Sequence, residues 1–404
     1  MFSRRLFLQS SVASAAYMAS GVLTARSAHA PGVTDTEIKF GQSIPYSGPA
    51  SAFSVIGRTE AAYFQMINEM GGVSGRKLNF ISLDDGYSPP RTIEQTRRLV
   101  EQEHVAFIFG TLGGFTNLAI RQYLNDNKIP QLFSAASADV IDDPQHYPWT
   151  MALNPAIVTE AHIYAKQILA TKPEAKIGIL FQNDAFGKVF QTGMREGLGP
   201  RHAAMIVKEV SYEVSDPTVD SQIITLQAAG VDTLIIAAAS PKAAAQAIRK
   251  AYDTGWMPDR YLFNGASSIK GTLKPAGLDK SKGVITAAYE KDPNDPRWKD
   301  DPGYKQWADF AAKHPGSTDL VDSASFYGFS AAILMVYVLK QCGEDLSRDN
   351  IMQNATNIKD LELPMSFPGA RINTSPDNYY PQRQLQLTRF NGMNWELFGD
   401  LISD

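Results

Sequence analysis

The sequence predicts an α/β protein built from two lobes, each a parallel sheet covered by helices, with a ligand cleft between them. Apolar strand-like runs alternate with amphipathic helical stretches along most of the chain, which is the pattern of parallel sheets with helices on both faces. The about 370 residues that follow the N-terminal segment are too many for one core. Three irregular, proline-containing segments interrupt the alternation and predict three hinge segments between the lobes.

Residues 1–30 have the order of an export signal. Arg4 and Arg5 precede a mildly apolar run and an Ala-His-Ala end, which gives the segment a twin-arginine character. Cleavage after Ala30 fits the small-residue rule, although Pro31 would follow the cut, so the mature start could also lie near Ala28. Because a signal is removed after export, we expect a periplasmic protein.

The mature chain is acidic and has no strong membrane segment. Removing Arg4, Arg5 and Arg26 takes the formal net charge from −4 to −7, which excludes an electrostatic case for nucleic acid or an anionic membrane. The longest apolar run, AAILMVYVL, is about half the ~20 residues that a span needs, so it predicts a buried helix. Cys342 is the single cysteine and has no disulfide partner. We expect a soluble monomer that does not insert into a membrane.

The first lobe is predicted over residues 31–154 and 290–362. Its strands are IKFGQSI, LNFISL, VAFIFG, IPQLFS and WTMAL. The first helix places Tyr63, Met66, Ile67 and Met70 at helical spacing, and a Gly-Gly pair ends it.

The second lobe is predicted over residues 155–289 and 363–404. Its strands are KIGILF, AMIVKEV, DTLIIAAA, RYLFNG and GVITAAY, followed by a terminal hairpin in which Asn391-Gly392 joins RQLQLTRF to MNWELF. The three crossings lie near Pro155, Pro293 and Pro368.

The stretch FGTLGGFTNLAI, residues 109–120, predicts an anion site. A strand, a glycine-rich turn and a helix follow one another, and the first turn of a helix offers unpaired N–H groups and a positive dipole end. A phosphate loop would need a lysine after its last glycine, and this stretch has none. A carboxylate is therefore the better-fitting anion.

No catalytic constellation is recognisable in the chain. It has no G-x-S-x-G elbow, no H-E-x-x-H and no paired cysteines, and its histidines are scattered. Asp84-Asp85 invites a metal site, but a pair followed by Gly86 at a strand end is more typical of a turn. We expect no enzyme activity, no cofactor and no metal, with an exported hydrolase as a weak alternative.

Motifs in this order resemble the extracytoplasmic solute-binding proteins of branched-chain amino acid ABC transporters, class I periplasmic binding proteins. The resemblance covers the mature chain and rests on IKFGQSIPYSGPAS, the block INEMGGVSGRKLNFISLDDGYSPPRTIEQTRRLVEQEHVAFIFG, IPQLFSAASA, QNDAFGK, DTLIIAAASPKAAAQAIRKA and PDNYYPQRQLQLTRFNGMNWELFGD. It implies two Rossmann-like lobes, three hinges, a small ligand trapped on closure, and a membrane permease as partner.

The resemblance also implies the ligand contacts. The turn after the third strand would offer backbone N–H groups and a hydroxyl to the ligand carboxylate from Leu112, Gly113 and Thr116. The next strand end would add the N–H of Ala135 and the hydroxyl of Ser137, and ligands do bind at the C-terminal ends of strands in open α/β sheets. The alternative role for Thr116 is a helix N-cap alone.

One position departs from the family. Where the family has a glutamate for the ligand's ammonium group, this chain has Lys242 and Ala243, although Asp184 or Glu290 could supply the acid instead. A buried ammonium without an anion costs on the order of several kcal/mol. The sequence therefore favours an aromatic or branched carboxylate without an obligatory α-amino group over an amino acid.

Aromatic residues are expected on the rest of the cleft. Five of them lie on predicted strand-end loops: Tyr46, Phe53, Phe115, Phe186 and Tyr289. Such side chains bury large areas against planar or aliphatic ligands, although any one of them could instead pack into its own lobe.

Two functions remain open from the sequence. The first is the periplasmic substrate-binding component of an ABC importer, trapping a small carboxylate for a permease. The second is a sensory protein of the same fold that acts on a chemoreceptor or kinase, and branched-chain amino acid binding in the strict sense is a weaker form of the first. One chain does not separate them, because the partner surfaces of both lie on the lobe tips.

Overall fold

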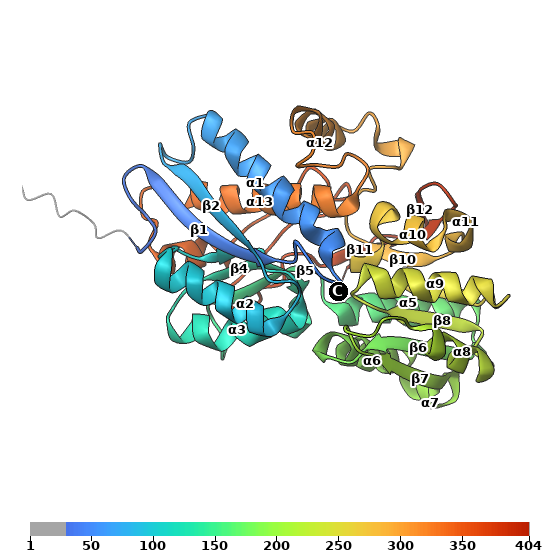
Figure 1. Ribbon diagram of the computed structural model, residues 1–404. Coiled ribbons are helices and arrows are strands. Elements are labelled where there is room, and N and C mark those ends of the chain that lie inside the picture. The colour runs from blue at the N-terminus through green and yellow to red at the C-terminus, as the bar shows by residue number, and fades with distance from the viewer. Residues whose placement is uncertain (1–29, 404) are drawn as a thin grey trace, which may run out of the picture.

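A computed structural model describes residues 30–403, so the predicted export signal lies outside the described residues, apart from its last position. Two α/β lobes lie side by side, and the chain crosses between them three times (Figure 1). The predicted fold class is confirmed: each lobe has a sheet dominated by parallel strands with helices packed against it.

The first lobe contains a five-stranded sheet in which all neighbours are parallel, in the order β2-β1-β3-β4-β5. Its strands are β1 (Glu37–Ile44), β2 (Lys77–Asp84), β3 (Ile108–Phe109), β4 (Gln131–Ser137) and β5 (Thr150–Asn154). Its helices are α1 (Ser54–Glu69), α2 (Pro89–Arg97), α3 (Gly114–Asp126), α4 (Ala138–Ile141), α12 (Pro302–Lys313), α13 (Ser323–Gln341) and α14 (Arg348–Ala355). All five predicted strands are present, and β3 is shorter than its apolar run.

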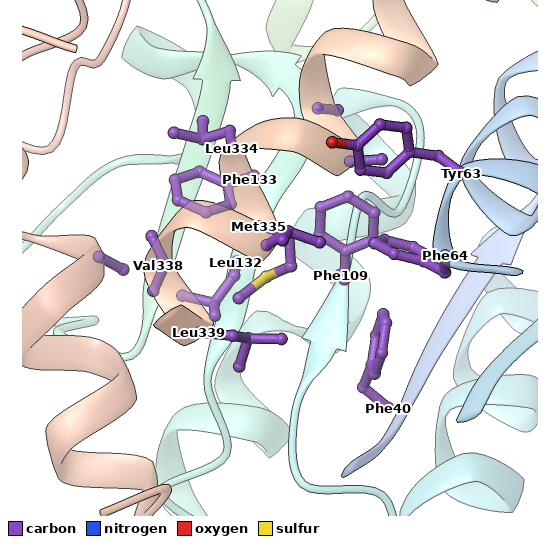
Figure 2. Packing of buried hydrophobic residues seen from close by; sticks show 14 of the residues in the cluster. Phe40, Tyr63, Phe64, Phe109, Leu132, Phe133, Leu334, Met335, Val338 and Leu339 are labelled. Carbon is purple, nitrogen blue, oxygen red and sulfur yellow. The ribbon is translucent and has the colours of Figure 1, made fainter. Parts of the chain in front are cut away.

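Helices α1 and α13 pack together on one face of this sheet, and α2 and α3 cover the other (Figure 1). Beneath α1 and α13 lies a core that includes Phe40, Phe64 and Phe109 (Figure 2). Phe40 stacks on Phe107 at 4.9 Å and meets Phe64 edge-on at 5.0 Å. Of the first helix's predicted core face, Tyr63 and Ile67 are buried, but Met70 is 68% exposed because α1 ends one residue before it.

Helix α13 contains the longest apolar run of the chain. It is long and apolar enough to cross a membrane, yet 72% of its most apolar window is buried inside the protein. Because its side chains fill the first-lobe core, including Leu334, Met335, Val338 and Leu339, its composition is explained by packing (Figure 2).

The second lobe contains an eight-stranded sheet in the order β12-β11-β10-β9-β8-β6-β7, with β13 paired to β11. Its strands are β6 (Ile177–Gln182), β7 (Ile206–Tyr212), β8 (Thr233–Ala237), β9 (Asp259–Leu262), β10 (Ile285–Ala288), β11 (Gln384–Phe390), β12 (Trp395–Leu397) and β13 (Ile402–Ser403). Its helices are α5 (Ile157–Thr171), α6 (Ala185–Leu198), α7 (His202–Met205), α8 (Asp220–Ala228), α9 (Pro241–Asp253), α10 (Lys274–Ala276) and α11 (Leu278–Ser281). Strands β11 and β12 form the predicted hairpin and extend the sheet in an antiparallel sense.

The second crossing, after β10, runs next to a first-lobe segment around Ser366. Glu290 and Ser366 form an antiparallel bridge, and the N–H of Lys291 donates to the carbonyl of Met365 at 2.8 Å. Met365, Ile372 and Tyr379 all belong to the first-lobe core, so the chain enters the second lobe after Tyr379 and not at the expected residue 363. Local sequence did not reveal this because the segment from 356 to 383 has little regular structure.

Candidate functional site

A cavity of about 150 Å³ lies between the lobes, at the C-terminal ends of the parallel strands of both sheets. Strand ends are where open α/β sheets place ligands, because the loops that follow them diverge. The first lobe lines it with Phe53, Ile56, Tyr87, Leu112, Gly113, Gly114, Ala135, Ser137, Asn154 and Tyr327, among others. The second lobe and the crossing segments line it with Gln182, Phe186, Ala239, Phe263, Asn264, Tyr289 and Glu290, among others.

The polar end of the cavity is built on β4 and on the start of α3. Gly113 caps α3 with a φ of 97°, and Gly114 in the first helical turn lines the cavity. First-turn N–H groups have no intrahelical acceptor, so they face the cavity with the positive end of the helix dipole. Ser137 ends β4, lines the cavity and makes no hydrogen bond through its hydroxyl to another described residue. Together these groups can bind an anion without a cationic side chain.

The backbone donors differ from those expected. The N–H of Gly113 donates to Ala135 O at 3.1 Å, and the N–H of Ala135 donates to Thr111 O at 2.9 Å. Both groups are thus used to pair the two strand ends, and the donors left for a ligand belong to the helical residues that follow Gly113.

Three of the nine predicted site residues do not line the cavity. Thr116 is fully buried, and its hydroxyl donates to the carbonyls of Leu112 and Gly113 in the preceding turn; it is therefore neither a ligand contact nor the N-cap of α3, which is Gly113. The hydroxyl of Tyr46 bonds Ser82 at 2.7 Å, away from the cleft. Phe115 packs edge-on against Tyr87, with ring centroids 4.7 Å apart, and so supports the wall from behind.

The other six predicted residues do line the cavity, namely Leu112, Gly113, Ala135, Ser137, Phe186 and Tyr289. Phe186 meets Phe263 edge-on at 4.6 Å, and the two rings form the second-lobe side of an aromatic wall. Tyr327 on α13 closes the opposite side and donates to Asn154 Oδ1 at 2.7 Å. Aromatic faces of this kind bind planar or branched apolar groups.

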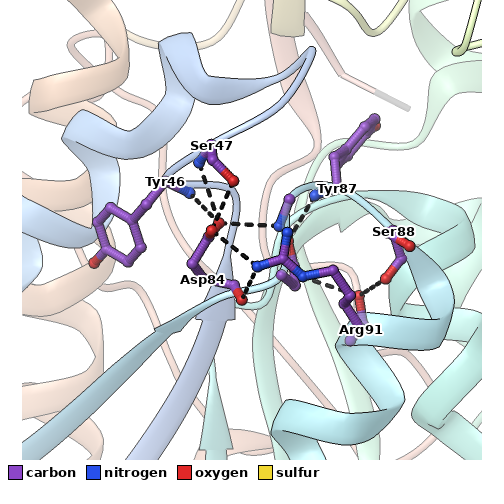
Figure 3. A network of polar contacts seen from close by, with 9 residues as sticks. Tyr46, Ser47, Asp84, Tyr87, Ser88 and Arg91 are labelled. Atoms are coloured by element: carbon purple, nitrogen blue, oxygen red, sulfur yellow. Dashed lines mark hydrogen bonds and ion pairs between the residues drawn. The ribbon is translucent and has the colours of Figure 1, made fainter.

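Asp84 shapes the loop that carries Tyr87 into the cavity (Figure 3). Its Oδ2 accepts from the Ser47 hydroxyl at 2.6 Å and from Arg91 Nη2 at 3.0 Å, and its Oδ1 accepts the N–H groups of Tyr46, Ser47 and Gly86 at 2.9 to 3.1 Å. Burial opposes ionisation, but these hydrogen bonds outweigh it and hold the pKa of Asp84 at about 2. The aspartate is therefore a turn former, as the sequence favoured.

An unpaired acid lies on the cavity wall. Within residues 30–403 Glu290 has no ion-pair partner; the adjacent Lys291 instead directs Nζ to Asp301 Oδ1 at 2.7 Å and to Pro364 O at 2.9 Å. Burial raises the pKa of Glu290 to about 8, against a smaller lowering by the neighbouring Ser330. The group is therefore largely protonated at neutral pH and can donate a hydrogen bond.

A second buried acid positions the floor of the cavity. Glu160 on α5 accepts from the Tyr164 hydroxyl and from the N–H of Asn264 at 2.8 Å, which fixes the loop after β9. Burial raises the pKa of Glu160 to about 8, and its hydrogen bonds lower it in part. The positions at which the resemblance expects an acid, Lys242 and Ala243, are not among the lining residues.

Contacts between the lobes close the rim of the cavity. The hydroxyl of Ser268 donates to Asp322 Oδ1 at 2.9 Å, and Lys270 forms an ion pair with Asp319. Ser268 and Lys270 follow β9 in the second lobe, whereas both aspartates precede α13 in the first. In the described part of the chain, no group of three His, Cys, Asp or Glu side chains is arranged to hold a metal ion.

Sequence reasoning missed several cavity residues. Tyr87 itself has a φ of 60°, an unusual conformation for a tyrosine that the sequence does not signal. Asn154 is the last residue of β5, a strand-end polar residue that could have been recognised. Tyr327 lies on α13, a helix whose sequence is apolar on all sides, so the sequence around it does not predict which residue faces the cavity.

Comparisons with known proteins agree with the two-lobed fold. The sequence profile of the family described as "Periplasmic binding protein" matches residues 37–394. The Leu/Ile/Val-binding protein homolog 7 of Brucella suis is 25% identical over 269 residues, and the match spans 63% of this chain and 65% of that relative.

Two solved structures have similar folds. A branched chain amino acid ABC transporter protein from Thermus thermophilus with bound valine has a TM-score of 0.78 at 16% identity, covering 92% of this chain and 98% of that one. A fatty acid ABC transporter substrate-binding protein from Thermomonospora curvata has a TM-score of 0.77 at 19% identity, covering 93% and 95%. At these identities the likeness shows the fold alone.

Proposed function

Since the chain belongs to the periplasmic binding protein family, we propose that it is the substrate-binding component of an ABC importer that traps a small carboxylate between its lobes. It would act in the periplasm after export and deliver the ligand to a membrane permease. The ligand class that we favour is an aromatic or branched acid.

The observation that carries this proposal is the asymmetry of the cavity. One end offers first-turn N–H groups of α3 and the free hydroxyl of Ser137, all neutral donors suited to a carboxylate. The remaining wall presents Phe186, Phe263 and Tyr289, which suit an apolar or planar body. Because Glu290 is largely protonated at neutral pH, it does not repel an anion there.

A specific observation supports a second candidate, a zwitterionic amino acid. Glu290 lines the cavity without a described cation, so an ammonium group beside it would shift the acid to its ionised form and pair with it. The relatives named for valine and for leucine, isoleucine and valine fit this alternative. The relative named for fatty acid fits the first candidate, so fold likeness does not choose between them.

A thermal-shift panel tests the proposal. A ligand stabilises the folded state by RT ln(1 + [L]/Kd), about 2.7 kcal/mol at a hundredfold excess over Kd, which gives a measurable rise in Tm. We expect aromatic and branched acids to raise the Tm of the mature protein, and leucine and valine to raise it less. Stabilisation by amino acids alone would favour the second candidate, and stabilisation by neither class would contradict the proposal.

A further inference from the structure

The cavity continues beyond the interlobe site into a side compartment of the second lobe. Its floor consists of Thr286 on β10, Thr388 on β11 and Leu397 on β12. Thr286 pairs with Thr388, and Thr388 pairs with Leu397, in antiparallel register. Residues directly opposite each other in antiparallel strands share a face. Trp298 and Trp395 line the same compartment, and all five residues belong to the continuous cavity.

The cavity is therefore long in one direction. Its lining includes residues in or directly after the adjacent strands β6, β8, β9, β10, β11 and β12. With neighbouring strands about 4.8 Å apart, this row extends on the order of 24 Å. A leucine-sized ligand spans only about 6 Å, given carbon–carbon bonds of about 1.5 Å. A compact ligand bound at α3 would leave the side compartment unfilled.

One polar group in the compartment has no partner within residues 30–403. Thr388 is 2% exposed, and its hydroxyl makes no hydrogen bond in the structure. A buried polar group without a partner costs about 1–3 kcal/mol, so such groups call for a ligand or water.

The two aspartates of the compartment already accept hydrogen bonds from other protein groups. Asp292 accepts the N–H of Trp395 at 3.1 Å and both the N–H and the side-chain amide of Asn294, so it holds β12 against the crossing segment. Asp295 accepts from Arg297 Nε at 2.8 Å and forms an ion pair with the same guanidinium. Among the buried side-chain polar atoms of the compartment, the hydroxyl of Thr388 is the one left without a hydrogen-bond partner within residues 30–403.

We propose that the ligand is an elongated carboxylate whose distal end lies in the side compartment and carries a hydrogen-bonding group for Thr388. This inference rests on the proposed function, since it takes the carboxylate end to lie at α3 and Ser137. The body of the ligand crosses the aromatic wall at Phe186 and Phe263, and its distal group reaches between Trp298 and the floor.

Calorimetric titration with two sets of probes tests the inference. The first set is phenylacetate, phenylbutyrate and phenylhexanoate, and the second is their para-hydroxy derivatives. We expect the affinity of the mature protein to rise with chain length, and the hydroxyl to add roughly three- to tenfold for the longest acid alone. In Thr388→Val that hydroxyl advantage disappears while the affinity for phenylhexanoate stays the same.

Thr272 provides a matched control, because it is also buried and its hydroxyl has no partner among the described residues, but it does not line the cavity. Thr272→Val should change neither series. If Thr388→Val does not fold, Leu397→Trp fills the compartment instead and should weaken the long acids selectively.

The outcomes separate the two proposals. Equal affinity for short and long acids, or a hydroxyl advantage that survives in Thr388→Val, would overturn the side-compartment inference and leave the proposed function in place. Binding of none of the acids would overturn the carboxylate proposal, and this inference with it.

Discussion

The two walls of the cavity are built in different ways. The first-lobe wall consists of strand ends and one helix start, and its donors are backbone N–H groups and the hydroxyl of Ser137. The opposite wall takes aromatic rings from strand-end loops of the second lobe, an acid from a crossing segment and a threonine from an antiparallel strand. The comparison shows that one wall can supply a general anion site while the other decides which ligand occupies it.

The largest expected effect comes from distorting the first-lobe wall. A Cβ on Gly113 would lie 2.6 Å from Tyr87 Cε2, and the φ of 97° is strained for any other residue. Gly113→Ala should displace the start of α3 and weaken carboxylate binding roughly a hundredfold, measured by titration calorimetry. Gly255→Ala is the control, since Gly255 has a φ of 71° but nothing within 4 Å. Equal losses of affinity in both variants would contradict a specific role for the α3 turn.

The next effect separates the hydroxyl of Ser137, which lines the cavity, from that of Thr116, which does not. Ser137→Ala removes a free donor that faces the cavity and should weaken binding about tenfold. Thr116→Val removes a hydroxyl that is used inside the protein, so it should cost about 1 kcal/mol of the free energy of unfolding with little change in affinity. Denaturant titration and calorimetry on both variants give the comparison, and the reverse pattern would restore Thr116 as a ligand contact.

A pH series sharpens the contrast at the opposite wall. Glu290 has a pKa of about 8, so its ionisation as the pH rises through that value places a negative charge beside the ligand. Affinity for a carboxylate should then fall several-fold, and the fall should be smaller in Glu290→Gln. Some pH dependence of the affinity should remain in Glu290→Gln, because Glu160 also has a pKa of about 8 and lies near Tyr289. For an amino acid the sign differs: its ammonium pairs with ionised Glu290, so affinity would hold or rise over the same range.

The smallest expected effect is at the rim. Lys270 and Asp319 form an exposed ion pair between the lobes, and such pairs contribute about 0.2–1 kcal/mol. Lys270→Ala should raise Kd no more than about threefold, mainly through faster dissociation in stopped-flow experiments, and the effect should shrink in high salt. Lys280→Ala removes a pair with Asp253 inside the second lobe and should leave Kd unchanged. An equal change in both variants would argue against a closing contact.

The sequence predicted most of the fold because the signals were local. Strand runs end in turns that the chain marks with polar or glycine residues. The run KIGILF, for example, forms β6. The anion-binding part of the first-lobe wall was predictable for the same reason, because a strand, a glycine turn and a helix are contiguous in FGTLGGFTNLAI.

The opposite wall was harder to predict because it is non-local. Glu290 was recognised as a possible substitute acid, but its place in the cavity depends on the bridge to Ser366, far away along the chain. Thr388 looks like any residue of a hairpin until its register against Thr286 is known. Thr116 shows a second limit: its sequence pattern predicted a ligand contact or an N-cap, but its hydroxyl donates to the carbonyls of the preceding turn, which only the geometry reveals.

The central claim is that the cavity recognises a carboxylate at the start of α3. Titration calorimetry of the mature protein with an aromatic or branched acid and with its amide tests this most directly, because the pair differs in charge and hardly in shape. We predict micromolar or tighter binding of the acid and at least a hundredfold weaker binding of the amide, about 2.7 kcal/mol. Equal binding of acid and amide, or submicromolar binding of leucine or valine with these acids inert, would contradict the account.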